Sequence, residues 1–324
     1  MPAYSRISLA APVILALIIL GSLFLVKLPE HTNLWREAGS FGHLPLFGLL
    51  SLVFLNLSRR LLGAGLRTRL NHYRLALAAS IVSGGLVELV QYFGPRDADL
   101  WDLALDAVGS LVFLAVVATF DRHLSEGDRP WGRAPARAIR AAAVLLVLAG
   151  FIPTGLWLGS YAYRSANLPC LCRFESFWEN RFLAAAHADL EITPSPTYWR
   201  REKTSKTAHV LFKPAPYSTV ALVEPYPDWT GYRSLAMTLF NPRDTAVTLD
   251  LRIHDRRHNN QYHDRYNKTL SLSPGENVVT ISLNEIEYAP VGRRLDMRSL
   301  AAVSLFAADL SDTLSVFLDE VCLR

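Results

Sequence analysis

Six polar residues that suit acid–base or metal chemistry lie at the ends of apolar runs in the first third of the chain. They are His43, Glu88, Gln91, Arg96, Asp102 and Asp106. An imidazole and carboxylates within reach of one another can transfer a proton or bind a divalent ion. Ionisable groups at the edge of a bilayer are costly unless they pair or line a wet cavity. These six residues, the polar cluster, therefore indicate a functional site by default.

Helical spacing predicts that several of these side chains share a helix face. Glu88 and Gln91 are three residues apart, and Asp102 and Asp106 are four residues apart. Residues at these spacings are neighbours on the surface of a helix. Arg96 lies between the two pairs in the sequence, where it could form ion pairs with several of the carboxylates. The spacing thus predicts one site built from separate helices.

Part of the cluster region also has a structural interpretation. Asp97 or Asp99 can cap a helix, and acidic residues are favourable in a first turn. Capping does not explain Glu88 and Gln91, which lie inside an apolar run. Three uses of the cluster stay open: an interhelical clamp or binding site, an enzyme that performs hydrolysis or transfer on a lipid-linked envelope substrate, and transport.

The apolar runs that position these residues predict a bundle of five transmembrane helices, in a polytopic membrane domain of residues 1–165. Hydrophobic residues make up 51% of the chain, more than is usual for a soluble protein. The runs cover about residues 8–26, 42–57, 75–93, 104–120 and 141–161. The first run lacks a convincing cleavage site for a signal peptide, so we interpret it as a retained helix. The second and fourth runs are short, so flanking polar residues must complete those spans.

Arginine residues predict the orientation of the helices. The loop between the second and third runs and the loop between the fourth and fifth runs are rich in arginine. By the positive-inside rule these loops and the N-terminus are cytoplasmic, and the residues after the fifth helix are extracytoplasmic. The formal net charge of +4 arises in residues 1–165, where it serves topology and contact with the lipid bilayer, so we exclude nucleic acid as a partner. We expect a multi-pass protein of the cell (inner) membrane with the polar cluster at its outer face.

The motif around the polar cluster resembles a known family. It reads Glu88-x-x-Gln91-Tyr-Phe-x-x-Arg96-Asp-x-Asp99-x-x-Asp102-x-x-x-Asp106-x-x-Gly109, with His43 opening the preceding span. This order resembles the VanZ-like family of small bacterial membrane proteins over about Trp35 to Val117. The resemblance implies that the six cluster residues match the family's polar signature, and it implies an association with resistance to glycopeptide antibiotics of the teicoplanin type. Residues 39–42 stand where the family often has an Asp-Lys pair, and Asp106 stands where Asn is more frequent.

The pattern of residues 170–324 predicts an all-β jelly-roll sandwich. Short alternating segments replace the long apolar runs, and turn signals such as Asn241-Pro242 and Ser273-Pro274-Gly275 separate them. The predicted strands are Val210–Phe212, Ser234–Phe240, Ala246–Ile253, Lys268–Leu272, Asn277–Leu283, Ala302–Phe306 and Leu314–Leu318. Residues Phe177 to Asp189 are predicted to add one short helix before the sheets.

Four segments of this domain, at 249–255, 262–267, 272–277 and 317–321, resemble carbohydrate-binding modules with the galactose-binding-like jelly-roll fold. The resemblance spans about Phe174 to Arg324 and implies a sandwich that in many relatives holds glycans, sometimes with a structural calcium. Flat aromatic rings stack on sugars, and charged groups bond to hydroxyls. The candidate carbohydrate-binding residues are Trp229, Tyr232, Arg252, Asp255, Tyr262, Asp264 and Arg265, with Tyr226 and Tyr266 as further aromatic candidates. The alternative is that these aromatic residues serve core or cross-strand packing.

Three cysteines, Cys170, Cys172 and Cys322, all lie in the domain that is predicted to be extracytoplasmic. An oxidising compartment permits a disulfide there. A bridge from Cys170 or Cys172 to Cys322 would join the first and last strands, and the alternative is three free thiols. The Cys-x-Cys spacing has no second chelating pair, so no zinc site is predicted in this domain.

Together these features predict an envelope membrane protein that binds or acts on a lipid-linked or peptidoglycan-related molecule at the outer membrane face, with an external domain that recruits glycan. Whether it is an enzyme stays open. The alternative is a non-enzymatic, anchored protein that binds polysaccharide or has a structural role. The two hypotheses differ in the effects of Glu88→Gln and His43→Ala, since a catalytic site loses activity at normal abundance whereas a packing clamp loses the folded protein.

Overall fold

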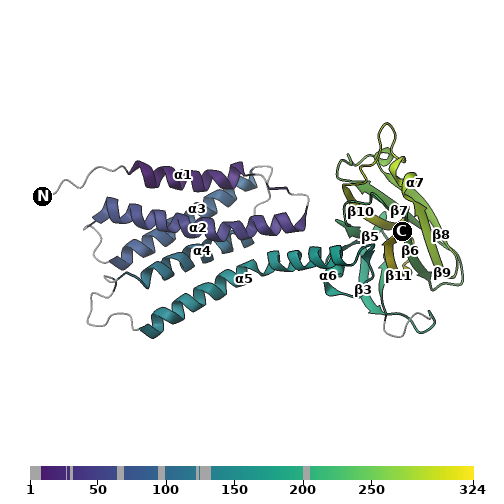
Figure 1. Ribbon diagram of the computed structural model, residues 1–324, viewed down its shortest axis with the longest axis horizontal. Coiled ribbons are helices and arrows are strands. Elements are labelled where there is room, and N and C mark those ends of the chain that lie inside the picture. Colours follow the sequence, from purple (N-terminus) through teal and green to yellow (C-terminus); the bar gives the residue numbers. More distant parts are fainter. Residues whose placement is uncertain are drawn as a thin grey trace. The chain divides into compact units, whose positions relative to one another are not determined.

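The chain combines a helical unit with a unit built mainly of strands (Figure 1). The computed structural model describes residues 9–26, 28–29, 32–63, 69–93, 99–121, 124, 133–199 and 205–324. The two compact units are Met1–Trp157 and Leu158–Arg324.

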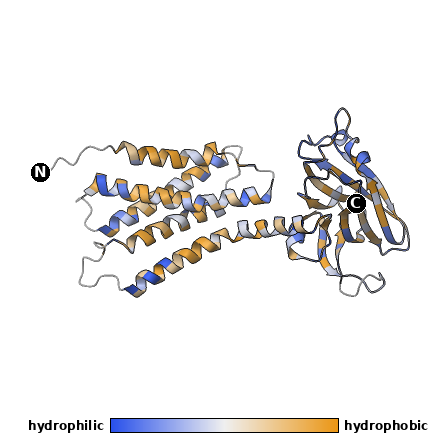
Figure 2. Cartoon of the chain, viewed as in Figure 1, coloured by the Kyte–Doolittle hydropathy of each residue, from blue (hydrophilic) through white to orange (hydrophobic). Residues whose placement is uncertain are grey.

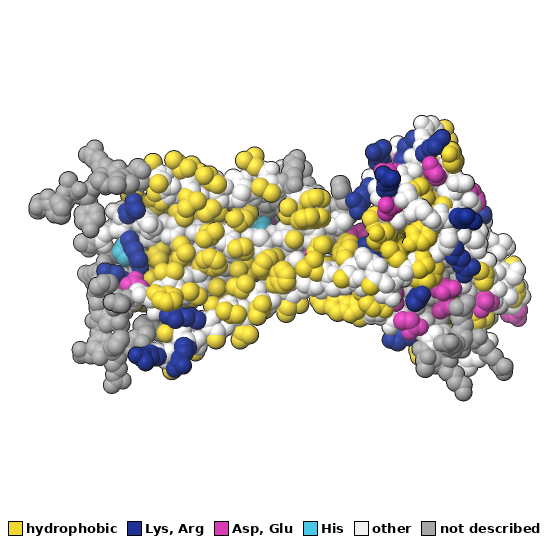
Figure 3. All heavy atoms as spheres, in the orientation of Figure 1, with side chains coloured by type: hydrophobic (Ala, Val, Ile, Leu, Met, Phe, Trp, Pro, Cys, Tyr) yellow, Lys and Arg dark blue, Asp and Glu magenta, His cyan; other side chains and the backbone are white. Residues whose placement is uncertain are grey.

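The helical unit is built from five helices. They are α1 (Ala10–Leu25), α2 (Asn33–Leu62), α3 (Arg69–Tyr92), α4 (Leu100–Ala118) and α5 (Arg133–Ala166). Within the described ranges, α2 to α5 are long and apolar enough to cross a membrane. The middles of the helices are hydrophobic (Figure 2), and apolar atoms cover the visible face of this unit (Figure 3). Many large apolar side chains on the helices are exposed, as expected where lipid rather than water surrounds them.

The first predicted span is corrected by the structure. Helix α1 has 16 residues. At a rise of about 1.5 Å per residue it extends about 24 Å, which is less than the roughly 30 Å of a hydrocarbon core. Ser8, the first residue of the predicted run, lies outside the described residues. Four described helices, rather than five, therefore have the length and apolarity of membrane spans.

The other spans are longer than their apolar runs. Helix α2 has 30 residues and begins ten residues before His43, with Thr32 as the N-cap residue. Helix α5 has 34 residues and extends past both ends of the predicted 141–161 span. The polar residues that flank each run continue the helix, because a helix satisfies its own backbone groups whatever its side chains. The short second run thus becomes a full-length span.

Close contacts hold α2, α3 and α4 together. A Cβ atom placed on Gly109 of α4 would overlap the carbonyl oxygen of Leu44 in α2, and one on Gly48 of α2 would overlap the ring of Phe113 in α4. Small residues at such crossings let helix backbones approach closely inside a membrane. The two glycines therefore set the distance between the helices that carry His43 and the aspartates.

Two antiparallel sheets form the second unit. The six-stranded sheet has the order β3-β4-β11-β6-β9, with β1 also paired to β11, and the five-stranded sheet has the order β2-β5-β10-β7-β8. The strands are β1 (Cys170–Cys172), β2 (Leu183–Ala186), β3 (Ala188–Pro194), β4 (Lys206–Phe212), β5 (Tyr217–Val223), β6 (Ser234–Asn241), β7 (Val247–Asp255), β8 (Tyr266–Leu272), β9 (Gly275–Ser282), β10 (Leu300–Ala308) and β11 (Leu314–Leu323). Short helices α6 (Phe177–Asn180), η2 (Tyr262–Asp264) and α7 (Leu283–Glu287) lie between strands.

The strand order has the pattern of a jelly roll. From β4 to β11, consecutive strands alternate between the two sheets, and the one exception is the β7–β8 hairpin. Two sheets connected in this way bury their facing sides against each other. In β7 the side chains of Leu249, Leu251 and Ile253 are fully buried, whereas the residues between them lie on the other side of the strand. The prediction of an antiparallel β-sandwich is confirmed.

The structure also adds strands that the sequence pattern did not indicate. Each of the seven predicted strands overlaps an observed one, but β2, β3 and β5 were not predicted. The helix predicted over Phe177 to Asp189 is wrong in length, since α6 ends at Asn180 and β2 follows. A capping box between Ser176 and Glu179 explains why a helix begins there. The alanine-rich β2 lies at a sheet edge, where pairing with β5 overrides its helix propensity.

A disulfide links the first and last strands of the sandwich. Cys170 in β1 bonds to Cys322 in β11, and these strands pair side by side. Cys172 is a buried free thiol, and burial raises its pKa, so that it stays protonated at neutral pH. The disulfide therefore closes the sandwich between its two ends, and Cys172 serves as a small core residue.

Candidate functional site

His43 is the centre of the polar cluster in the helical unit. Its Nδ1 atom lies 2.9 Å from Oδ1 of Asp106, and its Nε2 atom lies 3.6 Å from Oδ2 of Asp102. His43 is 2% exposed and Asp106 is fully buried. Asp102 and Asp106 lie one turn apart on α4, so both carboxyl groups face His43 on α2. A carboxyl group therefore lies beside each of the two imidazole nitrogens.

Helix α3 contributes the third side of the cluster. Glu88 and Gln91 are both buried, on the same helix face as predicted. Oε2 of Glu88 accepts a hydrogen bond of 2.8 Å from the backbone N–H of Asp99, the N-cap residue of α4. Ligand atoms of His43, Glu88 and Asp102 all lie within 4.8 Å of one another. Three helices therefore bring an imidazole and two carboxyl groups to one point.

Within the part of the chain that the structure describes, four buried polar atoms of the cluster have no hydrogen-bond partner. They are Oε1 of Glu88, Nε2 of Gln91, Oδ1 of Asp102 and Oδ2 of Asp106. Buried polar groups are almost always paired, because an unpaired one costs about 1–3 kcal/mol. Four such atoms in one place indicate a candidate binding site.

Three buried serines extend the polar face below the cluster, and the motif did not include them. The hydroxyls of Ser80 and Ser110 lie 2.7 Å apart, and the Ser110 hydroxyl also donates to the carbonyl of Asp106. The hydroxyl of Ser51 donates to the carbonyl of Gly48 at 2.7 Å. The signal was present in the sequence, since each serine lies one or two helical turns from a cluster residue on the same helix.

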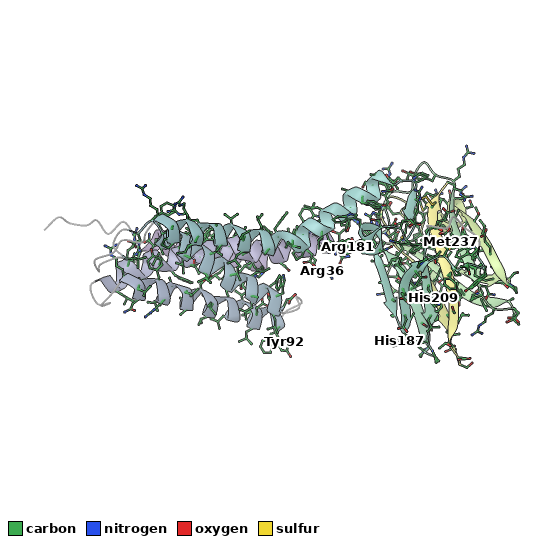
Figure 4. All side chains as sticks on the ribbon, turned by 90° about the horizontal axis from the view of Figure 1, so that it is seen from below. Arg36, Tyr92, Arg181, His187, His209 and Met237 are labelled. Carbon is green, nitrogen blue, oxygen red and sulfur yellow. A yellow bond between two sulfur atoms is a disulfide. The ribbon has the colours of Figure 1, made fainter. Side chains whose placement is uncertain are left out.

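The cluster lies far from the arginine-bearing end of the helices. At that end Arg59 of α2 and Arg69 of α3 both pair with Asp121, which follows α4. Along α2, His43 is about 24 Å from Arg59, a distance close to the thickness of a hydrocarbon core. Arg36 and Tyr92 are both labelled toward the other end of the unit, at separate places (Figure 4). The cluster is therefore near that opposite end, about one turn inside the ends of α3 and α4.

The cluster carries more acid than base. Glu88, Asp102 and Asp106 supply three carboxyl groups against one imidazole, and within the described ranges no Lys or Arg side chain pairs with them. Arg96, the predicted counter-charge, lies outside the described residues. Buried carboxylates without a balancing cation are expensive. The arrangement therefore suits a proton, a metal ion or a cationic guest.

The sandwich presents a second candidate surface, which we define as the outer face of the five-stranded sheet. Arg252 of β7 is directly opposite Ser304 of β10 and Asn267 of β8, on the side away from the core. Next to this row, Phe306 of β10 contacts the ring of Tyr217 of β5, with ring centroids 6.1 Å apart. Tyr217 is 66% exposed, and the buried Nε atom of Arg252 has no hydrogen-bond partner.

Two predicted carbohydrate-binding residues border the outer face. The guanidinium of Arg265 lies over the ring of Tyr262, and its Nε atom donates to Asn267. Tyr262 is 61% exposed. Asn267, the partner of Arg265, is opposite Arg252, and burial together with the positive charge of Arg252 lowers the pKa of Arg265. Exposed rings beside cationic donors are the groups that bind a sugar chain.

Other predicted carbohydrate-binding residues have structural positions. Trp229 is fully buried, and its indole N–H donates to the carbonyl of Tyr226 at 2.7 Å, so its ring is not available for stacking. Tyr266 is buried and donates to Glu285. Tyr232 is half-buried in the turn after Trp229 and lies outside the outer face. Aromatic type and a nearby turn therefore did not separate core rings from surface rings.

Asp255 and Asp264, two of the predicted carbohydrate-binding residues, form an ion-pair network with Arg293. Arg293 bonds to both oxygens of Asp255, at 2.6 and 3.0 Å, and also to Asp264. The bond from Arg293 holds the pKa of Asp264 well below its usual range. Burial alone would raise the pKa of Asp255, but the bonds from Arg293 and from the backbone N–H of Asp296 outweigh it and lower that pKa. The network fastens the loop after β7 to the loop before β10.

The described part of the sandwich contains no set of acidic side chains that suits the expected calcium ion. Its one close group of His, Cys, Asp or Glu ligand atoms is Cys170, Glu320 and Cys322. Both sulfur atoms of that group are in the disulfide, so they are not available as ligands. The structural calcium ion therefore stays a prediction from the sequence.

Comparisons with known proteins give matches among solved structures alone. No protein-family model and no curated protein matches the chain. The C-terminal sandwich resembles carbohydrate-binding modules. A family 11 module from Clostridium thermocellum in complex with a β-1,3-1,4-mixed-linked tetrasaccharide is 14% identical, with a TM-score of 0.37, over 48% of this chain and 94% of the module.

Two further structures show similarity at the same level. A family 30 module of a cellulosomal cellulase from Clostridium thermocellum is 10% identical, with a TM-score of 0.32, over 44% of this chain and 90% of the module. An exo-β-agarase is 16% identical, with a TM-score of 0.35, over 44% of this chain and 23% of the agarase chain. These similarities are low, and the strand order itself carries the assignment of the sandwich fold.

Proposed function

We propose that the chain is an envelope membrane protein whose polar cluster binds or acts on a lipid-linked or peptidoglycan-related molecule, and whose sandwich recruits glycan. The observation that carries the proposal is the set of four buried, unpartnered polar atoms around His43. A clamp that only holds helices together would pair such atoms, because every unpaired one costs stability. A ligand-binding site leaves such atoms unpaired until the ligand bonds to them.

The location of the cluster supports a role at the outer face of the cell membrane. The arginines Arg59 and Arg69 are at the end of the helices far from the cluster, and by the positive-inside rule that end is cytoplasmic. The disulfide between Cys170 and Cys322 supports an oxidising, extracytoplasmic compartment for the sandwich. Both observations favour cytoplasmic arginine-bearing loops and an extracytoplasmic sandwich.

The cluster has groups for acid–base work on a headgroup at that depth. His43 can exchange a proton through Nε2 while Asp106 holds Nδ1. The order of the cluster residues resembles the VanZ-like signature, which supports an envelope molecule as the substrate or ligand. We therefore expect cells that express the protein to tolerate more teicoplanin than cells without it.

The test of this part of the proposal uses Glu88→Gln and His43→Ala in such cells. We expect both variants to reach normal abundance in the membrane and to lose the protection against teicoplanin. Asp121→Asn, at the other end of the helices, removes a carboxyl group outside the cluster and serves as the matched control. Loss of the folded Glu88→Gln and His43→Ala proteins, rather than loss of protection, would contradict the proposal.

The outer face of the five-stranded sheet supports the glycan-binding part. Tyr217 and Tyr262 expose flat rings, and Arg252 and Arg265 supply donors close to them. Stacking on such rings combined with charge-assisted hydrogen bonds is the usual chemistry of sugar recognition. A chain of several sugars is the expected ligand, because this face is an open surface.

Retention on insoluble envelope polysaccharide tests this part with the full-length protein in detergent. We expect Tyr217→Ala and Tyr262→Ala each to weaken retention at least fivefold. Tyr198→Ala removes an exposed ring from the connection between β3 and β4, where it lies beside Phe240 of the other sheet, and we expect it to bind like the wild type. Equal retention of all three variants would contradict the assignment of this face.

A second candidate function is that of a non-enzymatic anchor. The outer face of the sheet favours it, because this face can bind a polysaccharide without any activity of the polar cluster. In that case the protection against teicoplanin is absent in the wild type, while retention on polysaccharide is normal.

A further inference from the structure

His43 is oriented like a metal-binding histidine. Its Nδ1 atom bonds to Oδ1 of Asp106 at 2.9 Å. This bond leaves Nε2 for a ligand on the opposite side of the ring, where Oδ2 of Asp102 lies 3.6 Å away. Histidines that bind metals commonly bond through their other nitrogen to a carboxylate, which fixes the ring and its tautomer. Asp106 thus has the supporting position behind the ring.

Three residues bring donor atoms close together beside this ring. The ligand atoms of His43, Glu88 and Asp102 lie within 4.8 Å of one another. Two atoms that bind one ion at about 2.0–2.4 Å can be at most about 4.8 Å apart, so the three spacings meet the first requirement for one shared ion. The three residues come from α2, α3 and α4, whose close packing fixes the spacing.

The charges and the unpartnered atoms also point to a cation. Oε1 of Glu88 and Oδ1 of Asp102 are acceptors without donors in a buried place. A divalent ion would offset two of the three carboxylates beside a neutral imidazole and would bond to these oxygens. A cluster held together only by hydrogen bonds would leave more negative charge next to lipid.

We propose that His43, Glu88 and Asp102 bind one divalent transition-metal ion, with Zn²⁺ as the best match. The inference deepens the proposed function of the polar cluster. An imidazole with two carboxylates suits Zn²⁺ better than Ca²⁺ or Mg²⁺, which prefer oxygen ligands alone. Three protein ligands leave a coordination position for water or a phosphate oxygen, as in catalytic zinc sites. Gln91, one turn beyond Glu88 on α3, also has a buried, unpartnered amide nitrogen.

Zinc titration of the full-length protein tests the inference. The protein is purified in detergent, stripped with a chelator and titrated with Zn²⁺ by calorimetry. We expect one ion per chain, with affinity at least tenfold lower in Glu88→Gln and in Asp102→Asn. Asp106→Asn should lower the affinity by about 10- to 100-fold, the usual loss for a group that supports a ligand. Glu37→Gln is the matched control, since Glu37 is on α2 outside the cluster.

A second measurement remains if a variant does not fold. Wild-type protein loaded with Co²⁺ should show the visible absorption of a four- or five-coordinate ion, and one equivalent of Zn²⁺ should abolish it. Folded wild-type protein that takes up neither ion would overturn the inference. Unchanged Zn²⁺ affinity in both Glu88→Gln and Asp102→Asn would overturn it as well, because the ion would then be bound elsewhere.

The two proposals can fail separately. If no Zn²⁺ binds while Glu88→Gln still abolishes protection against teicoplanin, the metal inference is wrong and the proposed function stands. If Zn²⁺ binds as expected while Glu88→Gln keeps full protection, the site is real and the proposed function is wrong.

Discussion

The helical unit and the sandwich each contain a buried cluster of acidic side chains, and the two clusters differ in how completely their atoms are paired. In the sandwich, Arg293 bonds to Asp255 and Asp264, and a backbone N–H completes the shell of Asp255. In the helical unit, the carboxyl groups around His43 leave three oxygens unpartnered. A cluster whose polar atoms are all hydrogen-bonded rigidifies a fold. A cluster with unpaired polar atoms can still bond to a ligand. The difference separates a structural network from a candidate site.

The largest expected effect concerns the disulfide that closes the sandwich. The described residues of the helical unit contain no disulfide. The disulfide joins residues 152 positions apart. We expect Cys170→Ser to lower the free energy of unfolding of the sandwich by about 4 kcal/mol, because a long closed loop restricts the unfolded chain. The helical unit should keep its stability. Pulse proteolysis of the full-length protein, with fragments assigned to each unit, measures both.

Cys172→Ala is the control for this prediction. It removes the free, buried thiol without opening the bridge. We expect it to cost about 1 kcal/mol, as a small loss of core volume. If Cys170→Ser costs no more than Cys172→Ala, the closure does not stabilise the sandwich.

A smaller effect should follow from removing Arg293, the shared partner of Asp255 and Asp264. Arg293→Ala leaves the buried carboxylate of Asp255 without its main partner, and we expect a loss of about 3 kcal/mol. Arg294→Ala removes a neighbouring guanidinium that is mostly exposed and lies 3.8 Å from Glu287, so it should cost less than about 0.5 kcal/mol. Urea denaturation of the full-length protein measures the two variants. Equal losses would mean that the network around Arg293 is not structural.

The same cluster predicts how the stability of the sandwich depends on pH. The folded-state pKa values of Asp255 and Asp264 are lowered, so their contribution is fully present above the unfolded Asp pKa of about 3.9. This contribution to stability is lost as the pH falls through the lowered folded-state pKa values of the two aspartates. We expect the sandwich to lose stability below about pH 4, and the loss to be smaller in Arg293→Ala. An identical acid profile in both proteins would contradict this account.

The sequence predicted the architecture better than the positions of single side chains. Alternation located β6, β7, β8 and β11, because a strand with one buried face has a period of two. The edge strands β2 and β3 were missed, since their burial comes from pairing and not from their own pattern. Helix length was also underestimated, because hydropathy detects the lipid-facing middle of α2 and not its polar first turns.

The two candidate sites were predictable to different degrees. Helical spacing placed Glu88, Gln91, Asp102 and Asp106 correctly on shared faces, because the period of a helix fixes which residues are neighbours. No comparable rule distinguishes an exposed tyrosine from a core tryptophan in a sandwich. The partner of Asp255 is distant in the sequence, and Tyr217 and Phe306 come together through strands β5 and β10, which the sequence alone does not pair.

The most direct test of the difference between the clusters is the stability of the metal-free Asp102→Asn protein. It is also the smallest effect that we expect. We expect the free energy of unfolding of the helical unit to stay within about 1 kcal/mol of the wild type or to rise, because the substitution removes a charge whose Oδ1 has no partner. Steric trapping of the full-length protein in detergent measures it. A loss of about 3 kcal/mol, equal to that of Arg293→Ala, would show that the carboxyl groups around His43 hold the helices together and are not kept open for a ligand.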